Sequence, residues 1–369
     1  MNDPATEYRP GPFSPLGGRP TRDEPVLAPV FGSWRDMVGR TLLLHPLGAA
    51  AGVVLLVLDG GQSGLAAPVL LVATLGPLWL NNLTAWFVSV APTKRLLDEP
   101  GRYVTAREGG LRYSTLAVAL RIADVPEERW VLLRLGAGAR AQLRADPRLW
   151  LVGPGRKGVA LAATPGSAML RVARVQSRPP RGARPVTPLA YGPSAPCDDA
   201  AVQAHMRSRR RISALSSVWW LLVLGWLVQS HLPVLLRTED PGRNAWVLAA
   251  ALAIAGLAVF SAGAYLTEFV RAGRAGRALT WTPLPATIDG EIEHSGHLTA
   301  HAKGRVRLPD GTERLVSFAG VSPDLLADVA SSGLLWVLGA LRHGGRAVAG
   351  VPGRPLAESV TLGRRTMEG

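Results

Sequence analysis

The chain of 369 residues has a single cysteine, Cys197, so no disulfide can form within it, and a free thiol suits a reducing cytosol. It is also poor in acidic side chains, with 27 Asp and Glu against 41 Lys and Arg, and only three of these 41 are lysine. Charged residues make up 18% of the sequence and hydrophobic residues 47%, yet the formal net charge is +14. This combination indicates that basic and apolar residues occupy separate segments.

No lysine or arginine occurs in four long apolar stretches, which are Leu42–Leu58, Ala66–Ala91, Ile212–Leu236 and Ala245–Val270. Each is about long enough to cross ~30 Å of hydrocarbon as a helix. We therefore expect four transmembrane helices in two hairpins. No apolar run closely follows the N-terminus, which excludes a cleavable signal peptide, and the Pro- and Gly-rich first 40 residues predict a disordered tail.

The basic residues also predict an orientation. If the N-terminal tail, the segment Pro92–Arg211 and the part following Val270 all face the cytosol, 39 of the 41 basic residues lie on that side. Cytoplasmic loops of membrane proteins carry such an excess. The expectation is a multi-pass protein of the bacterial plasma membrane with both termini in the cytoplasm.

Two segments far apart in the chain repeat one pattern, Leu149–Val175 and Leu335–Leu362. Each has a Leu-Trp pair, a basic Gly-containing turn, a strand of small residues and a Pro-Gly turn. Upstream of each, alternating strands precede a short helical stretch. Asp310-Gly311 is a strong hairpin signal, and Ser322-Pro323-Asp324 is typical of a helix start. The Leu-Trp pairs are expected to be core anchors, with a binding platform as the alternative for each Trp.

These patterns predict an α+β membrane protein in which four transmembrane helices carry two duplicated, small, cytosolic β-rich modules of barrel or roll type. Asp198 or Asp199 is expected to cap a helix that leads into the third span. The predicted divisions are a tail (1–40), transmembrane hairpin 1 (41–91), β-module 1 (92–176), a Pro/Arg-rich linker with a short helix (177–211), transmembrane hairpin 2 (212–270) and β-module 2 (271–369).

Motifs that carry chemistry are scarce, and the sequence predicts no catalytic residue, no cofactor and no metal site. His294, His297 and His301 have a ligand-like spacing, but they fall in a strand–turn–strand segment without any cysteine. Surface polar residues of a hairpin are the favoured interpretation over metal ligands. Gly153–Gly158 is rich in glycine and basic, yet a strand follows it, whereas a Walker loop opens a helix. We expect a hairpin turn there.

Polar residues within the apolar stretches leave two alternatives open, a transport path or contacts between helices, and the second is favoured. These residues are Asn81, Asn82 and Thr84 in the second stretch and Gln229, Ser230 and His231 in the third. Glu268 near the end of the fourth stretch is expected to reach the interface or to pair with Arg271.

The basic surplus lies mainly in the first half of the chain. The segment Pro92–Arg211 holds 22 basic and 9 acidic residues, whereas the part from Arg271 onward holds 12 and 9. Anionic lipids of the inner leaflet are an expected partner, and a solvated surface without a specific partner is the alternative. The residues expected to contact lipid are Arg207, Arg209, Arg210 and Arg211. A protein partner of the β-modules and a homo-oligomer are further expectations, and nucleic acid is not expected.

The pattern from Leu284 to Leu362, and more loosely from Arg102 to Val175, resembles poorly characterised membrane proteins of actinobacteria. In them a helical hairpin carries a small cytosolic β-domain of unknown function. The resemblance implies no catalytic residues. Together with the spans, it predicts a non-enzymatic, membrane-anchored scaffold or interaction protein, with a small transporter or channel component built from duplicated hairpins as the alternative.

Overall fold

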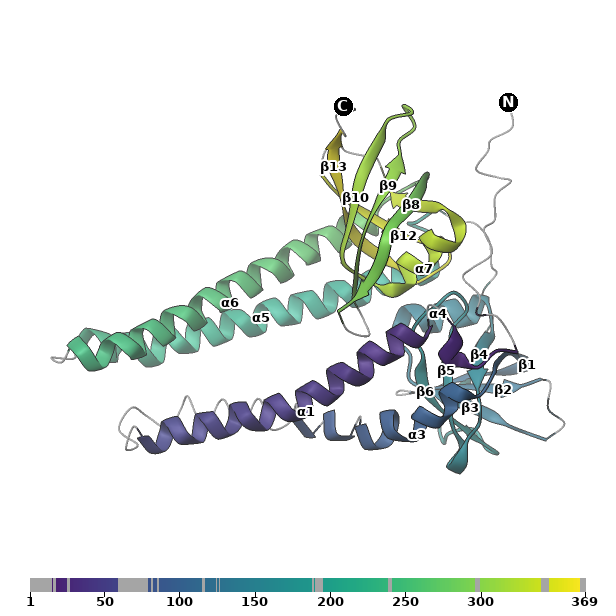
Figure 1. The fold of residues 1–369 in the computed structure, drawn as a ribbon, viewed down its shortest axis with the longest axis horizontal. Coiled ribbons are helices and arrows are strands. Elements are labelled where there is room, and N and C mark those ends of the chain that lie inside the picture. The colour runs from purple at the N-terminus through teal and green to yellow at the C-terminus, as the bar shows by residue number, and fades with distance from the viewer. Residues whose placement is uncertain are drawn as a thin grey trace.

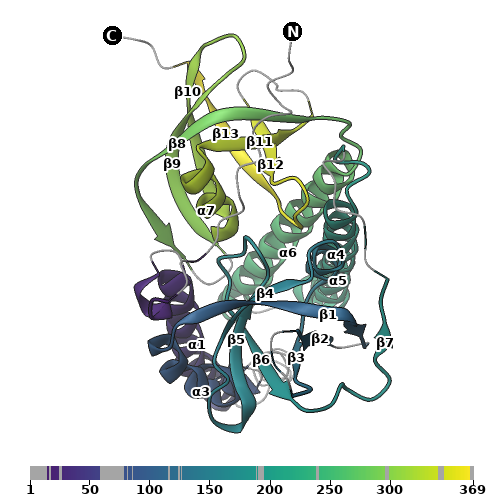
Figure 2. The same ribbon diagram turned by 90° about the vertical axis from the view of Figure 1, so that its right-hand side faces the viewer.

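A computed structural model of the chain shows two antiparallel six-stranded β-barrels, with long helices that extend away from them on one side (Figures 1 and 2). The structure describes residues 15, 18–24, 27–58, 79–80, 82–84, 86–114, 117–123, 125, 127–187, 189, 195–237, 241–295, 299–339 and 345–365.

The first barrel closes because its long first strand pairs with both the second and the fourth strand, which gives the order β1-β2-β3-β6-β5-β4. A helix, α4, links the third strand to the fourth, and a short additional strand, β7, pairs with β1. The elements are β1 (Gly101–Tyr113), β2 (Val118–Ile122), β3 (Trp130–Leu133), α4 (Ala137–Ala145), β4 (Arg148–Val152), β5 (Val159–Ala163), β6 (Arg171–Gln176) and β7 (Arg184–Pro185).

The second barrel has the order β8-β9-β10-β13-β12-β11, closed by pairing of β8 with β11. Counted from the first strand of each barrel, this is the same order, and α7 stands where α4 stands in the first. The structure therefore contains two copies of one β-rich module. The elements are β8 (Trp281–His294), β9 (Ala300–Arg307), β10 (Glu313–Val321), α7 (Pro323–Ser332), β11 (Leu334–Leu338), β12 (Arg346–Gly350) and β13 (Ala357–Arg365).

In each barrel a single bent strand makes the closure possible. The first half of β1 pairs with β4 and its last residues pair with β2, and the register shifts near Gly109, whose φ is +65°. In β8 the register shifts after Asp289, beside Gly290 with a φ of +79°. A glycine adopts positive φ at little conformational cost and lets a bulge bend the strand. The two parts of the bent strand can therefore pair with different strands and close the barrel.

The Leu-Trp pairs belong mainly to the barrel cores. Leu149, Trp150 and Leu335 are almost completely buried, which confirms their expected role, whereas Trp336 is only half-buried. Trp150 packs edge-on against Tyr103 of the neighbouring strand, with ring centroids 5.1 Å apart. The expected hairpin at Asp310-Gly311 is also confirmed, since Gly311 has a φ of +82° between the paired strands β9 and β10.

Three long helices occupy much of the sequence outside the barrels: α1 (Leu27–Leu58), α5 (Ala200–Arg237) and α6 (Pro241–Ala275). α5 and α6 follow each other in the chain and lie side by side (Figure 1). α1 already begins inside the segment expected to be a disordered tail. Short helical segments are η1 (Thr21–Asp23), η2 (Trp86–Val90), α3 (Ala91–Thr93), η3 (Lys94–Asp98) and η4 (Arg156–Gly158).

The prediction of four transmembrane helices is wrong, because no helix in the described ranges is both long and apolar enough to cross a bilayer. The predictions of a plasma-membrane location with cytoplasmic termini and of a membrane-anchored scaffold or transporter are therefore wrong as well. The first, third and fourth apolar stretches belong to the longer helices α1, α5 and α6, which have polar parts: Arg207–Arg211 lie within α5, and Arg271 and Arg274 within α6. Residues 66–78 of the second predicted span lie outside the described residues.

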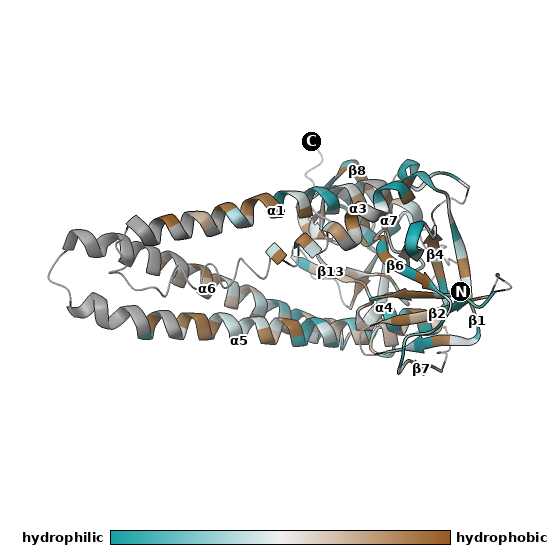
Figure 3. Cartoon of the chain, turned by 90° about the horizontal axis from the view of Figure 1, so that it is seen from below, coloured by the Kyte–Doolittle hydropathy of each residue, from teal (hydrophilic) through white to brown (hydrophobic). Residues whose placement is uncertain are grey.

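Hydrophobic residues recur along all three long helices (Figure 3). Many of their large apolar side chains are exposed. Leu43 is 70% exposed, Leu215 72% and Phe260 76%. Exposed apolar patches mark candidate interaction surfaces. The expected homo-oligomer and protein partner stay predictions.

Gly101 gives a test of barrel packing. A Cβ atom built on it would lie 2.3 Å from the Trp150 ring, so we expect Gly101→Ala to destabilise the protein by about 1–3 kcal/mol. The free energy of unfolding, measured with urea, checks this. Gly32→Ala in α1 is the control, because its Cβ would meet nothing within 4 Å and alanine favours a helix. Equal stabilities of the two variants would contradict the packing.

Candidate functional site

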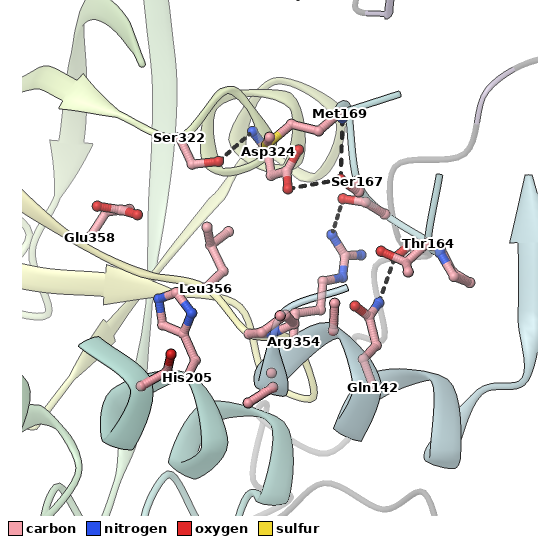
Figure 4. A pocket seen from close by; sticks show the side chains of 18 of the residues that line it. Gln142, Thr164, Ser167, Met169, His205, Ser322, Asp324, Arg354, Leu356 and Glu358 are labelled. Carbon is pink, nitrogen blue, oxygen red and sulfur yellow. Dashed lines mark hydrogen bonds between the residues drawn. The ribbon is translucent and has the colours of Figure 1, made fainter. Parts of the chain in front are cut away.

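A cavity of about 360 Å³ lies where the two barrels meet α5 (Figure 4). Its walls come from the first turn of α4, the segment between β5 and β6, α5, the first turn of α7 and the start of β13. The polar and charged side chains that line it are Gln142, Thr164, Ser167, Arg171, His205, Ser208, Arg209, Ser322, Asp324, Arg354 and Glu358.

Around this cavity the two barrels hold each other in equivalent ways. Each barrel has a Pro-Gly turn before its last strand, and each turn approaches the first part of the other barrel's helix. A Cβ atom on Gly138 of α4 would lie 2.3 Å from Cβ of Pro355 in the second barrel. On the other side, Asp324 of α7 accepts hydrogen bonds from Ala168 N (2.6 Å) and Ser167 Oγ (3.0 Å) of the first barrel. The duplicated turns therefore form a reciprocal junction.

Arg354, in the turn of the second barrel, is the buried cation of this junction. Its Nη1 lies 3.1 Å from Asp328 Oδ1 and donates to the carbonyl of Gly166 over the same distance. Gly166 has a φ of +73°, and a Cβ there would lie 2.2 Å from Cζ of Arg354. Both partners of the ion pair are almost fully buried. Removing one would leave the other charge unpaired in the interior, which is strongly destabilising.

Asp324 stands at the centre of the contact between the barrels. Burial raises the pKa of its carboxyl, and the hydrogen bonds from Ala168 and Ser167 act in the opposite direction, as do the more distant Arg354 and Arg171. Burial likewise raises the pKa of Asp328, against the effect of Arg354.

A second cluster of ion pairs includes two residues that line the cavity, Arg209 and Glu358. Arg209 of α5 contacts Glu268 of α6 at 2.8 Å and Glu358 of β13 at 3.3 Å. Burial raises the pKa of Glu358, while Arg209 lowers it. This cluster fastens the second barrel to the helix pair.

His205 is the one histidine among the described lining residues. Burial, and to a smaller extent the positive charge of Arg209, lower its pKa to about 4, so the ring is neutral at pH 7. Its Nε2 atom is buried and has no hydrogen-bond partner among the described residues. No described serine or cysteine is hydrogen-bonded to this atom.

The four arginines that were expected to contact lipid lie in different surroundings. Arg209 is engaged in the ion-pair cluster, and the guanidinium of Arg210 lies over the ring of Phe269 at 4.8 Å from the centroid. Arg207 and Arg211 are exposed. Glu268 pairs with Arg209 at 2.8 Å and lies 3.9 Å from Arg271, so its expected partner is its weaker one.

The other candidate residues lie away from the cavity. His301 contacts Gly320 N and Ser295 Oγ, His294 lies on the neighbouring strand, and His297 falls outside the described residues. In the ranges that the structure describes, no group of three His, Cys, Asp or Glu side chains could hold a metal ion. Gly153–Gly158 forms the turn between β4 and β5, as expected.

Of the polar residues in the apolar stretches, Thr84 donates to Leu80 O within its own turn, and Asn82 lies in a helical turn. Asn81 falls outside the described residues, as do the side chains of Ser230 and His231; Gln229 is exposed.

Sequence reasoning missed the residues that make the junction. The sequence pattern indicates Asp324 only as part of a helix start, which it is: Ser322 caps α7 by accepting from Asp324 N. Asp199, one of the two expected caps, does cap α5, and its other oxygen accepts from Gly353 N at 2.6 Å. The available signal was the repeat itself, because a duplicated module predicts a pseudo-symmetric interface.

Comparison with known proteins adds no relative. No protein-family model matches the chain, and no curated protein and no solved structure is significantly similar to it. The resemblance to actinobacterial membrane proteins thus stays an expectation.

Asp324 allows a test of the junction. Asp324→Ala removes both acceptors and leaves the Ala168 amide without its partner, so we expect a loss of about 1–3 kcal/mol in the free energy of unfolding. Asp324→Asn keeps one carbonyl oxygen and carries no charge to desolvate, so it should lose less than half as much. Urea titration measures both. Equal losses would show that the hydrogen bonds do not stabilise the junction.

His205 predicts a pH dependence. The pKa of its ring is about 4 in the folded chain, against 6.5 for a solvated histidine, so only the unfolded chain binds the proton between these values. The free energy of unfolding should therefore fall as the pH drops from 7 toward 4, by on the order of 2–3 kcal/mol from this residue. His205→Gln should lack this component. If the free energies of unfolding of the wild type and of His205→Gln changed in parallel between pH 7 and 4.5, the burial of the His205 ring would be contradicted.

Proposed function

We propose that the protein is a ligand-binding protein that holds a small polar molecule between its two barrels. The observation that carries this proposal is the cavity at the barrel junction, lined by parts of both barrels and of α5. Small-molecule sites are typically clefts of about 300–1,000 Å³ and occur preferentially at domain interfaces. The cavity's volume and position both agree with that description.

The chemistry of the lining favours binding over catalysis. The acids Asp324 and Glu358 and the cation Arg354 are held by partners in the protein, which keeps them fixed. A fixed polar wall orients a ligand without loss of side-chain freedom. A ligand that touches both barrels would also stabilise their junction, so occupancy of the cavity and the spacing of the barrels are coupled.

Ligand screening by thermal denaturation tests the proposal. A ligand at about 100 times its Kd stabilises the folded protein by about 2.7 kcal/mol, which raises the melting temperature measurably. We expect at least one compound from a panel of polar metabolites to do this for the wild type. Native mass spectrometry of the purified protein gives a second readout of a retained small molecule.

The variant Ser208→Trp should abolish the response, because Ser208 lines the cavity and a large side chain there would fill it. Ser177→Trp is the matched control on the exposed surface of the first barrel. Ser208→Leu serves if the tryptophan variant does not fold. A ligand that stabilises the wild type and Ser208→Trp equally would place binding elsewhere, and the absence of any retained or stabilising compound would refute the proposal.

A further inference from the structure

The two copies of the module differ at one arginine of their third strand. Glu128–Val131 at β3 and Glu313–Val316 in β10 match in sequence, and each ends on a valine of its barrel core. Arg314 therefore corresponds to Arg129. The side chain of Arg129 is 42% exposed, and it forms an ion pair with Glu127 at 2.8 Å. Arg314 is only 8% exposed and forms no hydrogen bond or ion pair with any residue in the described ranges.

Arg314 lies on the core side of β10. Residues at alternate positions of a strand share a face, and Val316 and Phe318 of this strand belong to the core of the second barrel. Val306, directly opposite Arg314 on β9, is fully buried as well. The arginine thus occupies a position of the kind that apolar side chains fill along the rest of the strand. Arginine is almost never buried to this degree without a partner, because an unpaired interior charge is destabilising.

The outer end of the Arg314 side chain remains accessible. Its Nε atom is buried and has no hydrogen-bond partner. The two Nη atoms also make no hydrogen bond within the described part of the chain, but they are not among the fully buried polar atoms. These two nitrogens are therefore open to the surface at the end of the barrel where β10 begins.

The strand beside Arg314 is irregular in this copy alone. Val316 is opposite Leu362 of β13, whereas Arg314 is opposite Arg365, so two residue steps on β10 correspond to three on β13. Such a bulge interrupts the ladder, and bulges are common next to functional sites. In the first barrel the corresponding strands, β3 and β6, pair without a shift. The bulge and the buried arginine thus occur together where the copies differ.

The acids of the neighbouring strands do not neutralise Arg314. Asp289 of β8 contacts Arg305 at 3.1 Å, and Asp310 accepts hydrogen bonds within its own turn. Glu313 is exposed on the outer face of β10, which is the face opposite to that of Arg314. The positive charge of Arg314 is therefore available to a group from outside these strands.

We propose that Arg314 binds an acidic group of a ligand, a phosphate or a carboxylate, at the end of the second barrel beside the bulge in β13. A guanidinium group suits such anions, because it can donate two parallel N–H groups to their oxygens. Arg314 does not line the cavity between the barrels, so this site is independent of the proposed function.

Arg314→Met tests the site. Replacement of a buried charge by an apolar side chain of similar length is often neutral or stabilising. In sodium chloride the variant should therefore melt at the same temperature as the wild type or at a higher one. It should bind the anion at least about tenfold more weakly, because the charged donors are lost. An arginine with a structural role alone would give the opposite result, a lower melting temperature with unchanged anion binding.

Arg129→Met is the matched control, because it makes the same change at the equivalent position of the first barrel. An exposed ion pair contributes little to stability, so this variant should bind and melt as the wild type does. Arg314→Lys keeps the positive charge but loses the paired donors, so its affinity should lie between those of the wild type and Arg314→Met. The lysine variant also serves if Arg314→Met does not fold.

The probe is inorganic phosphate, with acetate as the carboxylate arm and sodium chloride at equal ionic strength as reference. Calorimetry measures binding, and thermal denaturation measures the melting temperature of the full chain. A larger stabilisation by phosphate would assign a phosphate group, and a larger stabilisation by acetate a carboxylate. Wild-type protein that responds to neither anion more than to chloride would overturn the inference, as would equal anion binding by the wild type and Arg314→Met.

Two further variants exclude other locations of the anion. Ser208→Trp, which fills the cavity, should bind the anion as the wild type does, and a loss of binding would place the anion there instead of at Arg314. Glu368 follows β13 in the sequence. Tighter anion binding by Glu368→Gln would show that a carboxylate of the chain itself competes for Arg314, and it would overturn the inference of an external ligand.

Discussion

The arrangement of this molecule depends on one buried contact, the guanidinium of Arg354 between the carboxylate of Asp328 and the carbonyl of Gly166. Asp328 belongs to the second barrel and Gly166 to the first, so a single charged group joins the helix of one module to the turn of the other. A charge in such a position must keep its partners. The spacing of the barrels, and with it the cavity beside them, is fixed by that requirement.

Duplication explains why the junction is reciprocal, and the differences between the copies explain why it is not symmetric. Gln142 occupies in α4 the place that Asp328 has in α7, and it too holds a Pro-Gly turn, by donating to Pro165 O. One copy uses a neutral amide and the other an ion pair. Likewise Gly138 permits close approach where Asp324 makes hydrogen bonds. The cavity lies where this asymmetry leaves a helix end without a cap.

Local patterns predicted the modules well, because hairpin and helix-start signals act between near neighbours in sequence. Asp310-Gly311 and Ser322-Pro323 form what they indicate. The long apolar stretches led to a wrong prediction of transmembrane helices. Composition shows that a stretch is apolar, but it does not show that the helix carrying it extends into polar segments. α5 includes Arg209, whose pairing with Glu268 and Glu358 depends on two segments distant in sequence. No pattern of neighbouring residues predicts that contact.

The sequence by itself determined that one β-rich module occurs twice, that each copy has a helix before its Leu-Trp strand, and that no familiar catalytic motif accompanies them. These properties follow from the periodicity of apolar residues, from the residues at turns and from the repetition of one pattern. All three can be recognised in short stretches of the chain. Only the tertiary structure decided that the turns of one barrel meet the helix of the other and enclose a polar cavity. Contacts such as Asp324 with Ala168 join residues 156 positions apart, and their burial and charge balance exist only when both barrels are folded.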